Sequence, residues 1–169
     1  MTRPPFDAPS AEDVAVVSQQ LGRPARGVIG IAARCVCGRP TVVATSPRLP
    51  DGEPFPTLYY LSHPAATAAV STLEATGVMP VLAESLTGET AALYRSAHEQ
   101  YIADRELFEV VPEIAGVSAG GMPTRVKCLH ALVAHSLAAG PGVNPIGDAA
   151  LELASWSPDV CQCAVEPAP

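Results

Sequence analysis

The strand-like and helix-like stretches of this chain are separated along its length, which limits the folds it can adopt. Branched apolar residues dominate residues 26–35 and 40–47, with the turn-forming stretch VCGR between them, and TLYYLS at 57–62 repeats the pattern. Helical periodicity with end signals occupies residues 10–22 and most of the chain after residue 64. This order predicts an α+β protein, with a small antiparallel sheet of about three strands in the first third, packed by four to six helices.

Capping signals predict where the first helix begins and ends. Ser10 can cap its start, Asp13 three residues later can complete a capping box, and Gly22 can end it. Further helices are predicted over residues 64–77, 88–111, 125–139 and 148–156. Residues 115–123 (AGVSAGGMP) are predicted as a loop and residues 144–147 (NPIG) as a turn.

Length and composition restrict the organisation and the partners. A chain of 169 residues can bury a core without disulfides, and we expect a disordered segment over 1–9, one α+β domain over 10–157 and a tail over 158–169. No apolar run approaches the ~20 residues that span a bilayer, and the first residues lack a signal-peptide core, so we expect a cytoplasmic protein without membrane contact. A net charge of −7 with 10 scattered basic residues argues against nucleic-acid binding.

Five cysteines without an export signal favour metal binding or reactive thiols over a disulfide framework. Cys35 and Cys37 form one Cys-x-Cys pair, Cys161 and Cys163 form another, and Cys128 lies alone. Side chains two apart in a strand lie roughly 6.5–7 Å apart, so a turn must draw such a pair onto one ion. Thiolates favour zinc and iron–sulfur clusters. Incidental cysteines in a disordered end are the alternative for the tail pair.

The segment RVKCLHALVAHSLA places Cys128 and His130 at the start of a predicted helix. On a regular helix they project about 200° apart, so they can share a metal only if Cys128 lies at the frayed first turn. Cys128 is otherwise a buried small apolar residue, or a reactive thiolate whose pKa is lowered by Lys127, His130 and the helix N-terminus. Cys128 and His130 are therefore also catalytic candidates.

A second set of polar residues recurs at helical spacing on one face of the predicted helix over 88–111: Tyr94, His98, Tyr101 and Arg105. Arg125 and Lys127 follow a glycine-rich turn that leads into a helix start, which suits an anion. Arg105, Arg125 and Lys127 are therefore candidates for binding a small anionic ligand, and His98 is a further catalytic candidate. A half-exposed packing face is the alternative.

Three segments, FPTLYYLSHP, AGGMPTRVKCLHALVAHSLA and GVNPIGDAAL, resemble the bacterial domain-of-unknown-function family 501, which is common in actinobacteria. The resemblance runs from about Val14 to about Leu153 and implies no assigned activity. The family's genes often lie near those for enolase, a septum-formation initiator and an exopolyphosphatase, which implies an interaction module with a protein partner in cell division or the envelope. In the family pattern, Cys35 matches a cysteine, Cys128 and His130 match K-C-L-H, and His63 falls where many relatives carry cysteine.

An exchange between cysteine and histidine is one that zinc tolerates, since both are good zinc ligands. The candidate ligands that follow connect the strand region with the helical region: Cys35, His63 and Cys128, with a fourth from Cys161, Cys163 or His130. Three functions stay open. The protein is a metal-site protein, with zinc favoured over an iron–sulfur cluster. Alternatively, it is an enzyme that uses metal-bound water or the Cys128 thiolate on an anionic substrate, or it is the interaction module.

Overall fold

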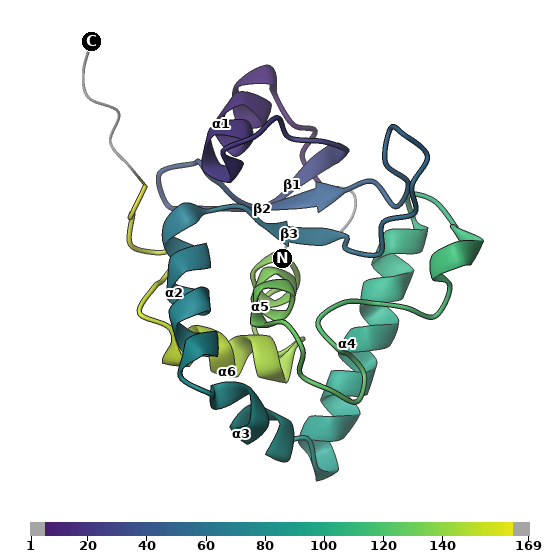
Figure 1. The fold of residues 1–169 in the computed structure, drawn as a ribbon, viewed down its shortest axis with the longest axis vertical. Coiled ribbons are helices and arrows are strands. Elements are labelled where there is room, and N and C mark those ends of the chain that lie inside the picture. The colour runs from purple at the N-terminus through teal and green to yellow at the C-terminus, as the bar shows by residue number, and fades with distance from the viewer. Residues whose placement is uncertain (1–5, 164–169) are drawn as a thin grey trace.

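A three-stranded antiparallel sheet divides the protein into two unequal halves. The structure is a computed structural model that describes residues 6–163. Strands β1 (Val28–Arg34), β2 (Pro40–Thr45) and β3 (Tyr59–Leu61) lie in the order β1-β2-β3. Helix α1 (Ala11–Leu21) covers one face of the sheet and the other helices lie on the opposite side (Figure 1). The predicted α+β arrangement is confirmed.

Alternate side chains of the central strand β2 face the two halves. Val43 packs with Ile31 and with Val17 of α1 in a small apolar cluster. Val42 and Ala44 belong to the larger core, on the side of the other helices. This alternation is the period of two that a strand imposes on its side chains, and it explains why the whole of β2 is buried.

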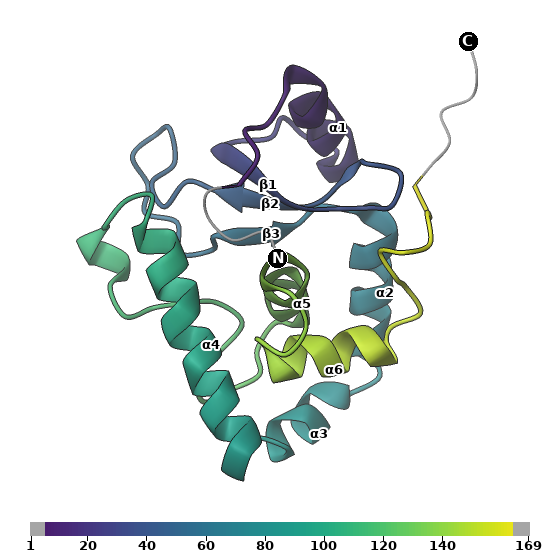
Figure 2. The same ribbon diagram turned by 180° about the vertical axis from the view of Figure 1, so that it is seen from behind.

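Helix α5 (Leu129–Ala139) runs through the centre of the larger half. Helices α2 (Pro64–Ala75), α4 (Gly88–Glu106) and α6 (Pro145–Leu153) surround it, and α3 (Val78–Glu84) connects α2 with α4 on the side away from the sheet (Figures 1 and 2). Eight of the eleven residues of α5 are buried. A helix enclosed on all sides needs little polar surface, which explains its apolar sequence.

Within the described residues, no single helix combines the length and the apolar character needed to cross a membrane. Helices α2 and α3 have the necessary length and apolar character only when they are taken together, and the chain bends by 80° between them.

The predicted cap of the first helix is confirmed. The Ser10 hydroxyl accepts a hydrogen bond from the Asp13 N–H, and the Asp13 carboxylate accepts one from the Ser10 N–H, both at 3.0 Å. Gly22 ends α1 in the left-handed conformation, with φ of 65°. The reciprocal bonds satisfy two N–H groups that a helix start otherwise leaves without a partner.

Several predicted boundaries are wrong. The helix predicted over residues 125–139 is α5, and it begins at Leu129 instead of residue 125, with Cys128 as its N-cap. The NPIG stretch is the first turn of α6 and not a separate turn, because the Asn144 side chain accepts from the Gly147 N–H at 3.0 Å and starts the helix there. Helix α4 ends at Glu106 instead of residue 111, and helix α3 was not predicted.

The segment predicted as disordered, 1–9, includes two residues that contact the core. Phe6 packs edge-on against Tyr59, with ring centroids 5.7 Å apart, and stacks on Phe108 at 6.1 Å. The Asp7 carbonyl accepts a hydrogen bond from the Ile31 N–H at 3.1 Å. Residues 1–5 lie outside the described part of the chain.

Arg105 is buried inside the fold and donates to three main-chain carbonyl groups. Its Nη1 donates to Pro56 O at 2.9 Å and Val117 O at 2.6 Å, and its Nη2 donates to Ile114 O at 2.9 Å. Burial lowers the pKa of this guanidinium. Arg105 thereby connects α4 with the loop before β3 and with the loop after α4, and it gives each of these three carbonyl groups a donor.

The tyrosines on the same face of α4 are also packing residues. The Tyr101 hydroxyl accepts from the Leu58 and Tyr59 N–H groups, at 2.7 and 3.2 Å. The Tyr59 hydroxyl donates to the Asp104 carboxylate at 2.7 Å. The polar stripe of α4 is therefore largely a hydrogen-bonded, buried surface.

Replacing Arg105 with methionine should lower the free energy of unfolding by about 2 kcal/mol or more, because the Pro56 and Val117 carbonyl groups lose this donor and the Ile114 carbonyl keeps only the Val117 N–H. The same change at Arg95, which is exposed on the same helix, should change it by no more than about 0.5 kcal/mol. Urea unfolding measures both. Equal stability of the two variants would show that the carbonyl contacts contribute little.

Candidate metal centre

The turn between β1 and β2 brings the first Cys-x-Cys pair together. The Cys35 N–H donates to Arg39 O and the Gly38 N–H donates to Cys35 O, both at 2.8 Å. Gly38 has φ of 89°, a conformation that glycine adopts without strain. The chain therefore reverses tightly over Cys35–Gly38. Cys35 is 4% exposed and Cys37 is exposed.

The C-terminal segment, residues 154–163, returns from α6 to this turn. Its course past α2 is visible as the yellow chain in Figure 1. Trp156 is buried with its ring centroid 5.5 Å from that of His63, and Pro158 O accepts from the Val36 N–H at 3.1 Å. These contacts carry Cys161 and Cys163 to the turn.

The sulfur atoms of the two pairs form one group. The Sγ atoms of Cys35, Cys37, Cys161 and Cys163 all lie within 4.8 Å of one another, and those of Cys37 and Cys163 are 3.4 Å apart. Four sulfurs in a tetrahedron around one ion, at metal–sulfur distances of about 2.3 Å, lie about 3.8 Å apart. The four cysteines could therefore hold a single metal ion.

His63 lies beside this group as the N-cap of α2. Its Nδ1 accepts from the Ala66 N–H at 3.3 Å, and its Nε2 lies 3.2 Å from Cys163 Sγ. Burial lowers the pKa of His63, which favours the neutral ring. Because Nδ1 uses its lone pair as the acceptor, the proton is on Nε2. His63 is thus placed to donate a hydrogen bond to the Cys163 sulfur.

The environment of the turn separates the acidities of the thiols. A hydrogen bond from the Arg39 N–H lowers the pKa of Cys37 to about 7. Burial raises the pKa values of Cys35 and Cys163. Cys37 therefore ionises before Cys35 and Cys163.

Cys128 belongs to a second group, with His130 and Glu74. One ligand atom of each residue lies within 4.8 Å of the other two. The contact between Cys128 and His130 lowers the pKa of the thiol and raises that of the imidazole. His63 begins α2 and Glu74 lies in its last turn. Glu74 is eleven positions after His63, which corresponds to about 16 Å along the helix.

The structure thus divides the ligand candidates from the sequence between two places. Cys35, His63, Cys161 and Cys163 lie together, whereas Cys128 and His130 lie at the far end of α2. Cys37 is the fourth cysteine of the first group, and its Cys-x-Cys spacing was the only sequence feature that indicated a role for it. Glu74 had no sequence signal, since it is 54 residues from Cys128 in an ordinary helical pattern.

The other candidates lie apart from both groups. Nδ1 of His98 lies 2.8 Å from the Ser118 hydroxyl, and burial lowers the pKa of His98. Arg105 is engaged by carbonyl groups, as described above. Arg125 and Lys127 are exposed in the segment before α5.

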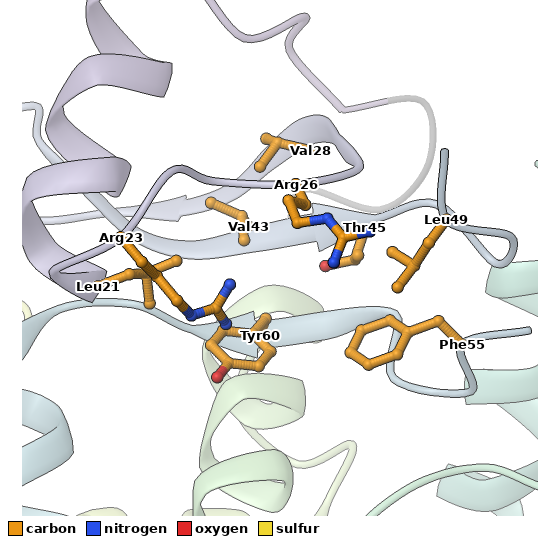
Figure 3. Close-up of a pocket in the computed structure, with 9 residues that line it drawn as sticks. All are labelled: Leu21, Arg23, Arg26, Val28, Val43, Thr45, Leu49, Phe55 and Tyr60. Atoms are coloured by element: carbon orange, nitrogen blue, oxygen red, sulfur yellow. The ribbon is translucent and has the colours of Figure 1, made fainter. Parts of the chain in front are cut away.

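A separate pocket lies on the α1 side of the sheet (Figure 3). Its walls are mostly apolar, and Arg23 and Arg26 add two guanidinium groups, of which that of Arg26 pairs with Asp51. The pocket shares no residue with either cysteine group and contains none of the candidates from the sequence. We therefore treat the cysteine groups as the candidate site.

A family model described as "Protein of unknown function (DUF501)" matches residues 31–152, most of the chain. The chain belongs to this family. The DUF501 match includes the first Cys-x-Cys pair, His63, Glu74 and the Cys128–His130 segment, and it ends before Cys161. Searches of curated proteins and of solved structures gave no significant match. The description of the family names no activity.

Replacing His63 with alanine should lower the free energy of unfolding, because the Ala66 N–H loses its capping acceptor. Asparagine is a good N-cap and should recover about 1 kcal/mol relative to alanine. Urea unfolding, followed by circular dichroism, measures the difference. Equal stability of the alanine and asparagine variants would contradict the capping role.

Proposed function

We propose that this DUF501 protein is a metal-binding protein in which Cys35, Cys37, Cys161 and Cys163 bind one zinc ion. The observation that carries the proposal is the convergence of four thiols from two segments more than 120 residues apart, with Sγ atoms within 4.8 Å. Four protein ligands close the coordination sphere, which is typical of structural zinc. The ion would attach the C-terminal segment to the β1–β2 turn.

The spacing of the sulfurs favours a single ion over an iron–sulfur cluster. A cluster contains several iron atoms, each reached by its own ligand, so its cysteine sulfurs lie further apart than the ligands of one ion. Among ions that favour four thiolates, zinc needs no change of oxidation state to stay bound. We therefore assign zinc to this site.

The C-terminal segment depends on such an attachment. Residues 154–163 contain no regular secondary structure, and Val160 and Cys161 are exposed. Trp156 and the Pro158 carbonyl provide contacts at its start, but the segment buries little surface after them. Zinc binding to structural sites contributes about 10–16 kcal/mol in zinc-finger peptides, which far exceeds what these contacts can supply.

The neighbouring donors suit a site with four thiolates. Four thiolates and one Zn²⁺ carry a net charge of −2, which hydrogen-bond donors at the sulfurs offset. The His63 Nε2–H is placed to donate to Cys163, and the Arg39 N–H contacts Cys37. In this arrangement Cys37 is one of the four zinc ligands. His63 does not bind the ion and supports the site through its hydrogen bond to Cys163.

A reducing compartment agrees with this assignment. The five cysteines form no disulfide among the described residues, and thiolates bind zinc only in the reduced state. Disulfides form and persist mainly in oxidising compartments. We therefore place the protein in the cytoplasm.

Removal of zinc should release the C-terminal segment. Trp156 is the single tryptophan of the chain, so its fluorescence reports on this segment alone. Treatment of zinc-loaded protein with a strong chelator should shift Trp156 emission to longer wavelength, because the indole becomes exposed. A Cys161→Ser/Cys163→Ser variant should show the shifted emission without chelator and contain one zinc fewer per chain than the wild type.

Cys128→Ser is the matched control, since it removes a thiol outside this group and should leave Trp156 emission unchanged. Full zinc content in the Cys161→Ser/Cys163→Ser variant would contradict the proposal. Iron in place of zinc in protein purified without oxygen would contradict the assignment of the metal.

A further inference from the structure

A second set of metal-binding side chains lies at the other end of α2. Glu74 comes from the last turn of α2, and Cys128 and His130 come from the start of α5. One carboxylate oxygen, one sulfur and one ring nitrogen of these residues lie within 4.8 Å of each other. None of the three side chains is part of the four-cysteine group.

Cys128 can meet His130 because it is not helical. As the N-cap of α5 it has φ of −149° and ψ of 107°, which is extended backbone. The separation of about 200° that a regular helix imposes on these two side chains therefore does not apply. The capping position turns the sulfur toward the imidazole.

The hydrogen bonds of His130 indicate which ring nitrogen is available. Its Nε2 lies 3.3 Å from Thr67 O and 3.0 Å from the Ser71 hydroxyl. A carbonyl oxygen can only accept, so Nε2 carries the proton. In the neutral ring, Nδ1 then has the lone pair, and it lies 3.3 Å from Glu74 Oε1. A metal-binding histidine commonly donates its other N–H to a carbonyl in this way.

Glu74 is held in position by the main chain of α5. Its Oε1 accepts from the Leu129 N–H at 2.7 Å, at the first residue of α5. Two ligands at about 2.0–2.1 Å from a tetrahedral ion lie about 3.3–3.4 Å apart, which agrees with the distance from Nδ1 to Oε1. The carboxylate, the thiolate and the imidazole lone pair all offer electrons, so a cation at their centre is favourable.

We propose that Glu74, Cys128 and His130 bind a second zinc ion and leave one coordination position open. A carboxylate and a thiolate together supply the two negative charges that neutralise Zn²⁺. The side chains of Glu74 and His130 are each 27% exposed, so an ion and a further ligand can reach them. Three protein ligands with an open position are the composition of catalytic zinc sites, in which the fourth ligand is water. This inference does not depend on the four-cysteine site.

Zinc content of purified, zinc-loaded protein tests the inference. The wild type should contain two zinc ions per chain, and Glu74→Gln, Cys128→Ser and His130→Ala should each contain one. Glu84→Gln removes an exposed carboxylate at the end of the neighbouring helix α3 and should keep two. Unchanged Trp156 emission in each variant shows that the C-terminal segment stays in place, and an unchanged circular dichroism spectrum shows that the fold is intact.

Cobalt substitution of the wild-type protein gives a second readout that needs no variant. Azide should alter the visible bands of Co²⁺ at a site with an open position, whereas a closed four-thiolate site should not respond. One zinc per chain with no azide response would overturn the inference and leave Cys128 and His130 as a hydrogen-bonded thiolate–imidazolium pair. The two sites fail separately: if Cys161→Ser/Cys163→Ser keeps the wild-type zinc content while Glu74→Gln lowers it, only the four-cysteine proposal is lost.

Discussion

Four thiols converge at one place, two from the β1–β2 turn and two from the C-terminal segment, and this convergence is the main constraint on the candidate site. Brought within 4.8 Å as thiolates, Cys35, Cys37, Cys161 and Cys163 would repel each other strongly unless a cation lies between them. The convergence also decides where the C-terminal segment lies. That segment places Trp156 over His63, and His63 caps α2 through the Ala66 N–H. A metal ion at the sulfurs would therefore stabilise the start of α2 as well as the end of the chain.

Helix α2 relates the two candidate sites. His63 at its N-cap faces the four-cysteine group, and Glu74 in its last turn faces Cys128 and His130. The helix lies against the central helix α5, so the start of α5 is fixed relative to Glu74 by the Leu129 N–H. As proposed, the first site would have four protein ligands and the second would have three. This difference separates a structural role from one that can bind an exogenous ligand.

Much of the fold could be predicted from the sequence, because local signals and final structure agree there. Runs of branched apolar residues form the three strands. The side chains of Ser10 and Asp13 cap the start of α1, and the backbone freedom of Gly22 lets the helix end there. The start of α6 was missed because a proline in the first turn of a helix resembles a proline in a turn, and only the Asn144 side-chain bond distinguishes them. Helix α3 has Pro80 within it and no side-chain cap, so its sequence gives no helical signal.

The candidate site was less predictable, because long-range geometry decides it. Cys-x-Cys spacing indicates both pairs, but only the path of residues 154–163 shows that they meet. The family pattern groups Cys128 with Cys35 and His63 as candidate ligands. It contains nothing about the length of α2, which separates Cys128 from the other two residues in the structure. In the sequence, Glu74 cannot be distinguished from an ordinary helical glutamate. Only the packing of α5 against α2 brings it to Cys128 and His130. Arg105 suited an anion by its position in the sequence, and three carbonyl groups of distant loops use its donors instead.

Diffraction from crystals of the protein, measured on both sides of the zinc absorption edge, tests the central claim most directly. We expect an anomalous peak that appears only above the edge, about 2.3 Å from each sulfur of Cys35, Cys37, Cys161 and Cys163. An anomalous map without a peak at these sulfurs, or a C-terminal segment that does not reach the β1–β2 turn, would contradict it.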